Sequence, residues 1–295
     1  MVKRLEMGLR GVMPILATPF TESNQVDEED ASQLIEYLLA QGVHGVAATG
    51  GAGEAKVLTR SERERLVSLA LERVGGRVPV LVGVSAPTTD ESVQHAKLAN
   101  RLGAAGVFAV VPEHTRGDEA AMFDYYSAIA NVLDCPLFIQ DTSEREVPVS
   151  LIERAARELP PVRYVKEETD DVQHKISAIR DACGEELKIF SGGGTFIAEL
   201  IRGAVGVIPG SIYVGPMVRI YEFYQQGDVR SARAEYNRIL PLITWRSRFY
   251  LAGMKEVLFQ KGIFKTPYVR EPAPKLDQMD REELSAILES IGEPN

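Results

Sequence analysis

Short apolar runs rich in β-branched residues recur along the chain, and longer amphipathic stretches separate them. Runs of four to eight such residues are typical of buried strands. Because these runs are almost continuously apolar, they indicate a parallel sheet that is covered on both faces. The predicted strands are residues 12–17, 45–48, 80–84, 107–111, 136–139, 162–165, 188–190 and 207–209.

The stretches between the strands repeat their apolar positions with a helical period. Thr59 and Glu62 have the spacing of a capping box, which opens a helix. Gly42, Gly103 and Gly203 come where helices end before the next strand, as C-cap glycines do. The predicted helices of this part are residues 30–40, 61–73, 91–101, 122–132, 150–158 and 172–182.

The strand-and-helix unit returns eight times, which fits a closed (β/α)₈ TIM barrel better than an open sheet. We therefore assign residues 1–215 to the barrel. Residues 216–295 are predicted to be a helical extension packed on it, because no linker marks a second domain. The predicted helices of the extension are residues 218–226, 230–242, 245–260 and 281–291.

Composition narrows the class of protein. The 295 residues are 45% hydrophobic and 25% charged, with a net charge of -9. That charge argues against nucleic acid or an anionic membrane as a partner. The chain shows no signal-peptide pattern and no apolar run of membrane-spanning length, so a cytoplasmic location is expected. Two cysteines and four scattered histidines predict neither a disulfide framework nor a metal site.

The segment RYVKEETDD (163–171) places Lys166 and two acids directly after an apolar run. Active sites of these barrels form at the carboxyl ends of the strands. A desolvated lysine there can attack a carbonyl carbon and form a Schiff base. The alternative is a strand-end lysine paired with Glu167 or Glu168 in water, and the residues alone leave both interpretations open.

A second candidate is the glycine-rich segment TGGAGEAKVLTRSER (49–63), which follows the second predicted strand. Backbone N–H groups in such a turn can face an anion. Gly51 and Ala52 are small enough to let a carboxylate approach. The alternative is a tight turn that needs glycine for its backbone angles. The glycine spacing does not match a dinucleotide fingerprint.

Several motifs occur in an order that resembles one family. They are PILATPF (14–20), Asp27, GGAGEAKVLTRSER (50–63), residues 78–99, VKEE (165–168) and RGAVGVIPG (202–210). The chain resembles the dihydrodipicolinate synthase and N-acetylneuraminate lyase superfamily of Schiff-base lyases on (β/α)₈ barrels. The resemblance implies that Lys166 is the nucleophile and that Gly51, Ala52 and Ile208 bind a small 2-oxo acid. It also implies a homotetramer that needs no metal or organic cofactor.

The chain departs from the pattern of that family where protons are usually transferred. Gly51 and Ala52 replace two hydroxyl residues, and Gln140 replaces the tyrosine that usually carries a proton to the bound keto acid. His114 lies where many synthases have a Tyr-Tyr pair. Arg145 aligns with the arginine that synthases use for the carboxylate of a second substrate.

Two acids are candidates for the missing proton transfer. Glu168 lies two residues after Lys166, so strand alternation puts both on one face. Glu199 opens a short helix after the seventh predicted strand. The alternatives are a salt bridge at the barrel rim for Glu168 and an exposed helix position for Glu199. The Gln-Asp pair at Gln140, the Lys-x-Glu motif from Lys166 to Glu168 and the Gly-Gly pair form a pattern that resembles the 2-keto-3-deoxy-sugar-acid dehydratases, particularly those acting on L-2-keto-3-deoxyarabonate.

The prediction is therefore a lyase that eliminates water from a 2-keto-3-deoxy sugar acid, with Lys166, Glu168 and Glu199 as catalytic residues. The substrate-binding prediction covers Gly51, Ala52, Gln140, Ile208, His114 and Arg145. One alternative is a pyruvate-dependent aldolase or synthase, such as dihydrodipicolinate synthase or N-acetylneuraminate lyase. A different class also stays open, a barrel that binds a keto acid as a sensor without turnover.

Overall fold

The computed structural model describes residues 8–293, and it divides into two compact units. The first, here called the strand unit, contains the described residues up to Met13 together with His44–Ala48 and Gly76–Pro209. The second, the helical unit, contains Pro14–Val43, Thr49–Gly75 and the described residues from Gly210 onward.

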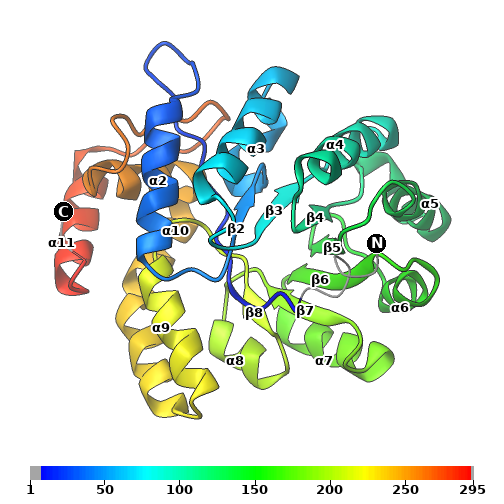
Figure 1. Cartoon of the computed structure of the whole chain (residues 1–295). Coiled ribbons are helices and arrows are strands. Elements are labelled where there is room, and N and C mark those ends of the chain that lie inside the picture. The colour runs from blue at the N-terminus through cyan, green and yellow to red at the C-terminus, as the bar shows by residue number, and fades with distance from the viewer. Residues whose placement is uncertain (1–7, 294–295) are drawn as a thin grey trace. The chain divides into compact units, whose positions relative to one another are not determined.

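All eight strands belong to one parallel sheet in the strand unit (Figure 1). Its order is β1-β8-β7-β6-β5-β4-β3-β2. The His44 N–H donates to the Val12 carbonyl at 2.9 Å, which joins β1 to the segment leading into β2. The sheet is that of the predicted (β/α)₈ barrel. The strands are β1 (Gly11–Val12), β2 (Val46–Ala48), β3 (Val80–Gly83), β4 (Gly106–Ala109), β5 (Leu137–Thr142), β6 (Val162–Glu168), β7 (Lys188–Ser191) and β8 (Gly206–Val207).

Helices surround the outer side of β3 to β8 in the strand unit (Figure 1). Their buried faces carry alanine and isoleucine, such as Ala96, Ile152 and Ile176, which cover strands that are themselves buried. This two-sided burial explains why the strand sequences are apolar without alternation. These elements are α4 (Thr89–Leu102), the 3-10 helix η3 (Glu113–Thr115), α5 (Glu119–Ala130), α6 (Val149–Glu158), α7 (Val172–Cys183) and α8 (Phe196–Ile201).

The helical unit holds the remaining helices. The capping box predicted at Thr59 and Glu62 opens α3, and Asp27 caps α2 by accepting from two backbone N–H groups. α9 and α11 both pack against α10. The elements are α2 (Glu28–Ala40), the 3-10 helices η1 (Gly51–Gly53) and η2 (Ala55–Val57), α3 (Arg60–Val74), α9 (Val214–Gln225), α10 (Val229–Gln260) and α11 (Gln278–Ser290).

Several predicted boundaries were wrong, and the largest differences are in β1, β6 and α10. The first strand ends at Val12, although the apolar run continues. β6 does not end at residue 165, as predicted, but continues to Glu168, because β5 also continues and pairs with it as far as Thr142. The two helices predicted in residues 230–260 are one element, α10, which is broken at Tyr250 rather than between them. The boundary near residue 215 stays a prediction.

No helix within residues 8–293 is both long and apolar enough to cross a membrane.

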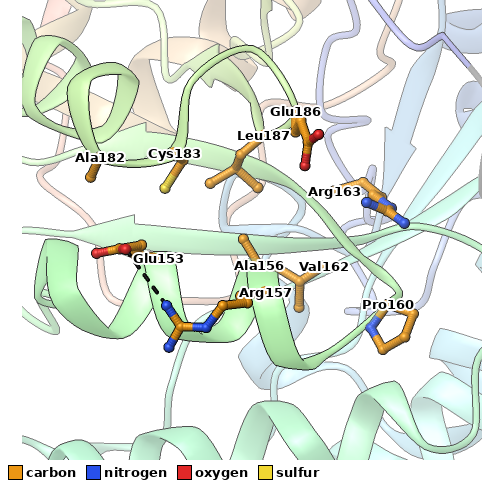
Figure 2. Close-up of a pocket in the computed structure, with 10 residues that line it drawn as sticks. All are labelled: Glu153, Ala156, Arg157, Pro160, Val162, Arg163, Ala182, Cys183, Glu186 and Leu187. Atoms are coloured by element: carbon orange, nitrogen blue, oxygen red, sulfur yellow. Dashed lines mark ion pairs between the residues drawn. The ribbon is translucent and has the colours of Figure 1, made fainter.

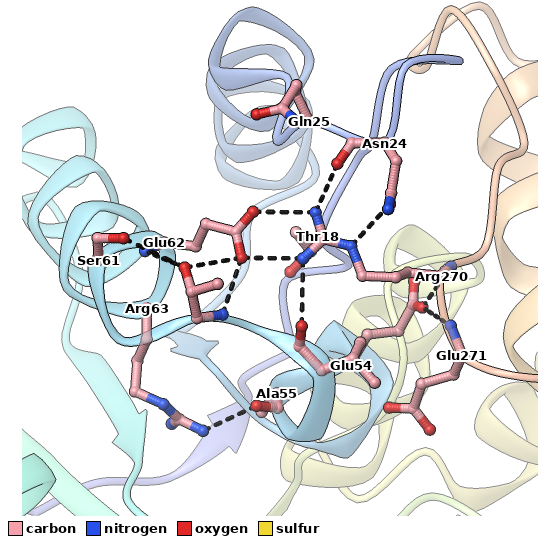
Figure 3. Close-up of polar contacts among 12 residues, drawn as sticks. Thr18, Asn24, Gln25, Glu54, Ala55, Ser61, Glu62, Arg63, Arg270 and Glu271 are labelled. Atoms are coloured by element: carbon pink, nitrogen blue, oxygen red, sulfur yellow. Dashed lines mark hydrogen bonds and ion pairs between the residues drawn. The ribbon is translucent and has the colours of Figure 1, made fainter.

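A buried ion pair anchors the C-terminal part of the helical unit. Glu54 and Lys255 are both fully buried and form an ion pair. The other oxygen of Glu54 accepts from the backbone N–H groups of Arg270 and Glu271, at 2.8 and 2.7 Å (Figure 3). Lys255 also donates to the Tyr268 carbonyl at 2.7 Å. Glu54 therefore joins the glycine-rich segment to α10 and to residues 268–271.

A second ion pair strengthens the same connection. The guanidinium of Arg270 binds both oxygens of Glu62 at 2.9 Å (Figure 3). It also lies 4.0 Å from the ring centroid of Phe20. The bond from Arg270 lowers the pKa of Glu62 to about 2. Burial lowers the pKa of Lys255 to about 8, although the charge of Glu54 opposes that shift.

We expect Lys255→Met to lower the free energy of unfolding by about 3 to 5 kcal/mol, because it leaves the Glu54 carboxylate buried without its cation. The double variant Glu54→Gln with Lys255→Met should recover much of that loss. Urea unfolding followed by circular dichroism measures both values. The exposed Lys97→Met serves as the control. Equal stability of Lys255→Met and the control would contradict the role assigned to this pair.

Candidate active site

The register between β5 and β6 brings three predicted site residues together. Gln140 lies opposite Lys166, and Thr142 lies opposite Glu168. The Nζ of Lys166 is 2.8 Å from Oε2 of Glu168, and the Gln140 amide donates to the same oxygen at 2.5 Å. Because side chains alternate along a strand, Lys166 and Glu168 share a face, as predicted. The same carboxylate oxygen of Glu168 thus contacts both the amine of Lys166 and the amide of Gln140.

Lys166 lies in an apolar environment. Its exposed fraction is 1%, whereas 26% of the Glu168 side chain is exposed. The register places Phe138 opposite Tyr164, two residues before Gln140 and Lys166, and their rings stack with centroids 4.4 Å apart. Phe190, which pairs with Lys166 on β7, lies 5.9 Å from the Tyr164 ring. The amine is therefore removed from water while the carboxylate beside it remains accessible.

Glu199 is not an exposed helix residue. It lies in the first turn of α8 and is fully buried. Its Oε1 accepts from the backbone N–H and the hydroxyl of Thr195 at 2.9 and 3.0 Å, and Ser191 donates its hydroxyl to Oε2. The Ser191 hydroxyl in turn accepts from the Gly193 N–H at 2.8 Å. Glu199 therefore fixes the glycine-rich loop that follows β7.

Glu168 and Glu199 line the same cavity, which has a volume of about 210 Å³. Its wall also contains Gly192, where a Cβ atom would lie 2.3 Å from Cγ of Glu168. Glycine is required there for Glu168 to keep its position. The lining residues are Glu167, Glu168, Thr169, Val172, Gly192, Gly194 and Glu199.

A second charged cluster lies on the other face of the same two strands, and the sequence analysis missed it. Asp141 and Glu167 face each other in the register and are both fully buried. The Nζ of Lys175 on α7 lies 2.6 Å from Oδ2 of Asp141 and 2.8 Å from Oε1 of Glu146. Thr169 donates its backbone N–H to Glu167 at 2.9 Å. Strand alternation applied to Asp141 and Glu167 was the signal that could have revealed the cluster.

Two carboxyl groups and one amine share this cluster, so its protonation is unusual. Burial and the nearby charge of Asp141 raise the pKa of Glu167 to about 8. Burial also raises the pKa of Asp141, against the opposing effect of Lys175. Glu167 is therefore largely protonated at neutral pH and directly follows Lys166 in the chain.

The other predicted residues of the strand unit lie in different surroundings. Ile208 is buried, and its N–H donates to the Ser191 carbonyl at 2.9 Å. The guanidinium of Arg145 donates to the Val111 carbonyl at 3.3 Å, while its buried Nε has no hydrogen-bond partner. His114 is exposed on η3 and, within residues 8–293, makes no hydrogen bond to Lys166 or Glu168.

Gly51 and Ala52 belong to the helical unit, where they form the turn η1. Thr49 and Glu54 on either side have positive φ angles of 54°. A Cβ atom on Gly53 would lie 2.7 Å from the Leu16 carbonyl, so glycine is required there by close packing. None of the glycines in this segment has a positive φ angle, so the structure does not support a turn that needs glycine for its backbone angles. Carboxylate binding by Gly51 and Ala52 stays a prediction.

A larger cavity of about 390 Å³ lies at the opposite end of β6, where that strand begins (Figure 2). Val162 and Arg163 line it together with Cys183 at the end of α7. Arg157 and Glu153 form an ion pair of 3.6 Å on its wall. None of the predicted site residues lines this cavity, and catalytic groups of such barrels gather at the carboxyl ends of the strands.

Within the described part of the chain, no three His, Cys, Asp or Glu side chains are grouped so as to hold a metal ion.

The model of the dihydrodipicolinate synthetase family matches residues 8–291. The chain belongs to this family. An uncharacterised DapA-like lyase of Halobacterium salinarum is 33% identical, with 97% of this chain and 95% of that protein covered. The L-2-keto-3-deoxyarabonate dehydratase of Azospirillum brasilense is 29% identical, covering 94% of this chain and 93% of that enzyme.

Solved structures show the same relationship. The dihydrodipicolinate synthase of Thermotoga maritima is 26% identical and superposes with a TM-score of 0.90, over 96% of this chain and 99% of that one. Dihydrodipicolinate synthetase family members are thus named both as synthases and as a dehydratase. Membership assigns the chain to a family of lyases, and sequence identity does not choose the substrate.

We expect Glu167→Gln to change how stability depends on pH. The pKa of Glu167 rises from 4.5 in the unfolded chain to about 8 in the folded one, so between these values the folded state binds more protons. Stability of the wild type should therefore fall as pH rises from about 4.5 to 8, by roughly 1 to 3 kcal/mol from this group. Glu167→Gln should lose that part of the slope.

Urea unfolding at a series of pH values measures this difference. The matched control is Glu186→Gln, because Glu186 is exposed. Parallel pH profiles of the wild type and Glu167→Gln would contradict the raised pKa.

Proposed function

We propose that this member of the dihydrodipicolinate synthetase family is a Schiff-base lyase that removes water from a 2-keto-3-deoxy sugar acid. The observation that supports it most is the contact of Lys166 with Glu168, whose oxygen also binds Gln140. A buried amine beside a partly exposed carboxylate provides a nucleophile and a base at the same strand end. Glu168 also lines a cavity together with Glu199, the second predicted acid.

The proposed reaction begins when the neutral amine of Lys166 attacks the C2 carbonyl and water leaves, which gives an imine. The imine then takes a proton from solvent and becomes an iminium. The iminium withdraws electrons from C3, so a base can take a C3 proton. Glu168 is the proposed base. The electron pair then expels the C4 hydroxyl, which leaves as water with the proton that Glu168 took from C3. Hydrolysis of the product imine restores Lys166.

Supporting roles follow from the same contacts. Gln140 holds Glu168 next to the amine. Both oxygens of Glu199 are bound by Ser191 and Thr195, which supports a positioning role for Glu199 alongside the predicted acid role. We keep Gly51, Ala52 and Ile208 as proposed substrate-binding positions, and His114 and Arg145 as proposed contacts to the rest of the substrate.

A pyruvate-dependent aldolase or synthase is the second candidate, and the similarity to the Thermotoga maritima synthase favours it. Gln140 in place of a tyrosine counts against it, since an amide does not transfer protons as a phenol does. A keto-acid sensor would use the same Lys166 contact without turnover. The homotetramer and the cytoplasmic location stay predictions.

Borohydride reduction in the presence of pyruvate should add roughly 72 Da to Lys166, because reduction fixes the imine as a stable amine. Peptide mapping by mass spectrometry locates the adduct. Lys166→Ala should lose both the adduct and turnover while keeping its circular dichroism spectrum. An adduct on Lys56 or Lys175 instead, or none at all, would exclude the proposed nucleophile.

Glu168→Gln should keep Schiff-base formation but lower turnover by roughly two to four orders of magnitude, because glutamine keeps the volume and removes the basicity. Glu199→Gln should also lower turnover. The assay follows 2-keto-3-deoxyarabonate by chromatography and compares the semialdehyde product with pyruvate. Mostly pyruvate from the wild type would show carbon–carbon cleavage and replace the dehydratase by an aldolase. If the wild type forms the borohydride adduct on Lys166 but shows neither dehydration nor carbon–carbon cleavage, the sensor is favoured.

A further inference from the structure

A break in α10 directs a tyrosine toward the glycine-rich segment of the helical unit. Tyr250 has φ 44° and ψ -110°, which is neither right- nor left-handed helix, although helix continues on both sides. A Cβ atom on Gly51 would lie 3.7 Å from the Tyr250 hydroxyl. The hydroxyl thus approaches η1 at a residue that has no side chain of its own.

The surrounding structure imposes this conformation on Tyr250. After the break, Lys255 is held by its buried ion pair with Glu54. At Gly253 a Cβ atom would lie 3.0 Å from Phe249 and 3.1 Å from the Trp245 ring, so the two halves of α10 pack closely. Unfavourable backbone angles that are held this firmly occur often at ligand sites.

Arg246 lies one turn earlier on α10 and brings a positive charge to the same place. Its guanidinium carbon is 4.8 Å from the centre of the Tyr250 ring. Its Nε is buried without a hydrogen-bond partner, and within residues 8–293 no carboxylate pairs with Arg246. One of its terminal nitrogens would lie 3.8 Å from a Cβ atom on Gly210. The guanidinium therefore faces a second position that lacks a side chain.

We propose that Arg246 and Tyr250 form a binding site for a carboxylate of the substrate. A guanidinium without an acidic partner, in a chain with a net charge of -9, is suited to an anion from outside the protein. The Tyr250 hydroxyl supplies a further donor close to Gly51, where a Cβ atom would lie 3.7 Å from it. This inference names a substrate-binding part of the proposed function and rests on that function for the identity of the ligand.

The carboxylate could belong to C1 of the 2-oxo acid or to a second acid group at the far end of the substrate. Two probes separate these sources and cannot form a Schiff base, because they have a hydroxyl in place of the carbonyl. Lactate carries one carboxylate, and 2-hydroxyglutarate carries two. Lactamide, which is neutral, is the ligand control.

Isothermal titration of the full-length chain measures binding of each probe. Arg246→Gln should weaken carboxylate binding by about tenfold to a hundredfold, because it removes hydrogen bonds from a charged donor. Tyr250→Phe, which removes only the hydroxyl, should weaken it by about threefold to tenfold. Arg246→Lys should recover part of the affinity. Arg248→Gln, two residues further on and exposed, should bind as the wild type does.

If Arg246→Gln loses affinity equally for lactate and 2-hydroxyglutarate, the site binds the C1 carboxylate. If it loses affinity for 2-hydroxyglutarate alone, the site binds a second acid group. The proposal is overturned if the wild type binds neither acid. It is also overturned if Arg246→Gln binds the two acids with the same affinities as the control Arg248→Gln. A further contradiction would be that Arg246→Gln weakens the binding of neutral lactamide as much as it weakens the binding of the acids. Failure of the proposed function shows separately, as absence of the borohydride adduct while Arg246→Gln still weakens acid binding.

Discussion

The in-register pairing of β5 and β6 is the constraint on which the candidate active site depends. It places Gln140 beside Lys166 on one face and Asp141 beside Glu167 on the other. A shift by one residue would move each of these side chains to the opposite face of the sheet. The amine would then lie among the carboxyl groups near Lys175, and Glu167 would enter the barrel. The buried cluster behind the sheet therefore helps to keep the reactive groups on the correct side.

The helical unit depends on a comparable constraint, the pairing of Glu54 with Lys255. Glu54 belongs to the glycine-rich segment, whereas Lys255 lies on α10 just after the break at Tyr250. Because a buried carboxylate without its cation is costly, the pair fixes the position of α10 relative to η1. The conformation of Tyr250 and the direction of its hydroxyl follow from that position. A charge buried for structural reasons thus controls a residue proposed to meet the substrate.

Features set by neighbouring residues could be predicted from the sequence. The period of apolar residues located the strands and helices, and alternation put Lys166 and Glu168 on one face. Contacts that depend on distant residues could not be predicted in this way. The bond from Gln140 to Glu168 requires the register of two strands, and the burial of Glu199 requires Ser191 and Thr195. The break in α10 was missed because neither proline nor glycine lies next to Tyr250 to mark it, whereas the predicted gap at residues 243–244 is helical.

Gly192 has a consequence for how this site could change during evolution. A Cβ atom there would overlap Cγ of Glu168, so a side chain at position 192 and Glu168 in its present position exclude each other. An ancestor with a larger residue at 192 could hold a glutamate in this position only after that residue had become glycine. The reverse path is open, because a small residue at 168 is compatible with glycine at 192. Glycine at position 192 must therefore appear before the glutamate at position 168 can take this position.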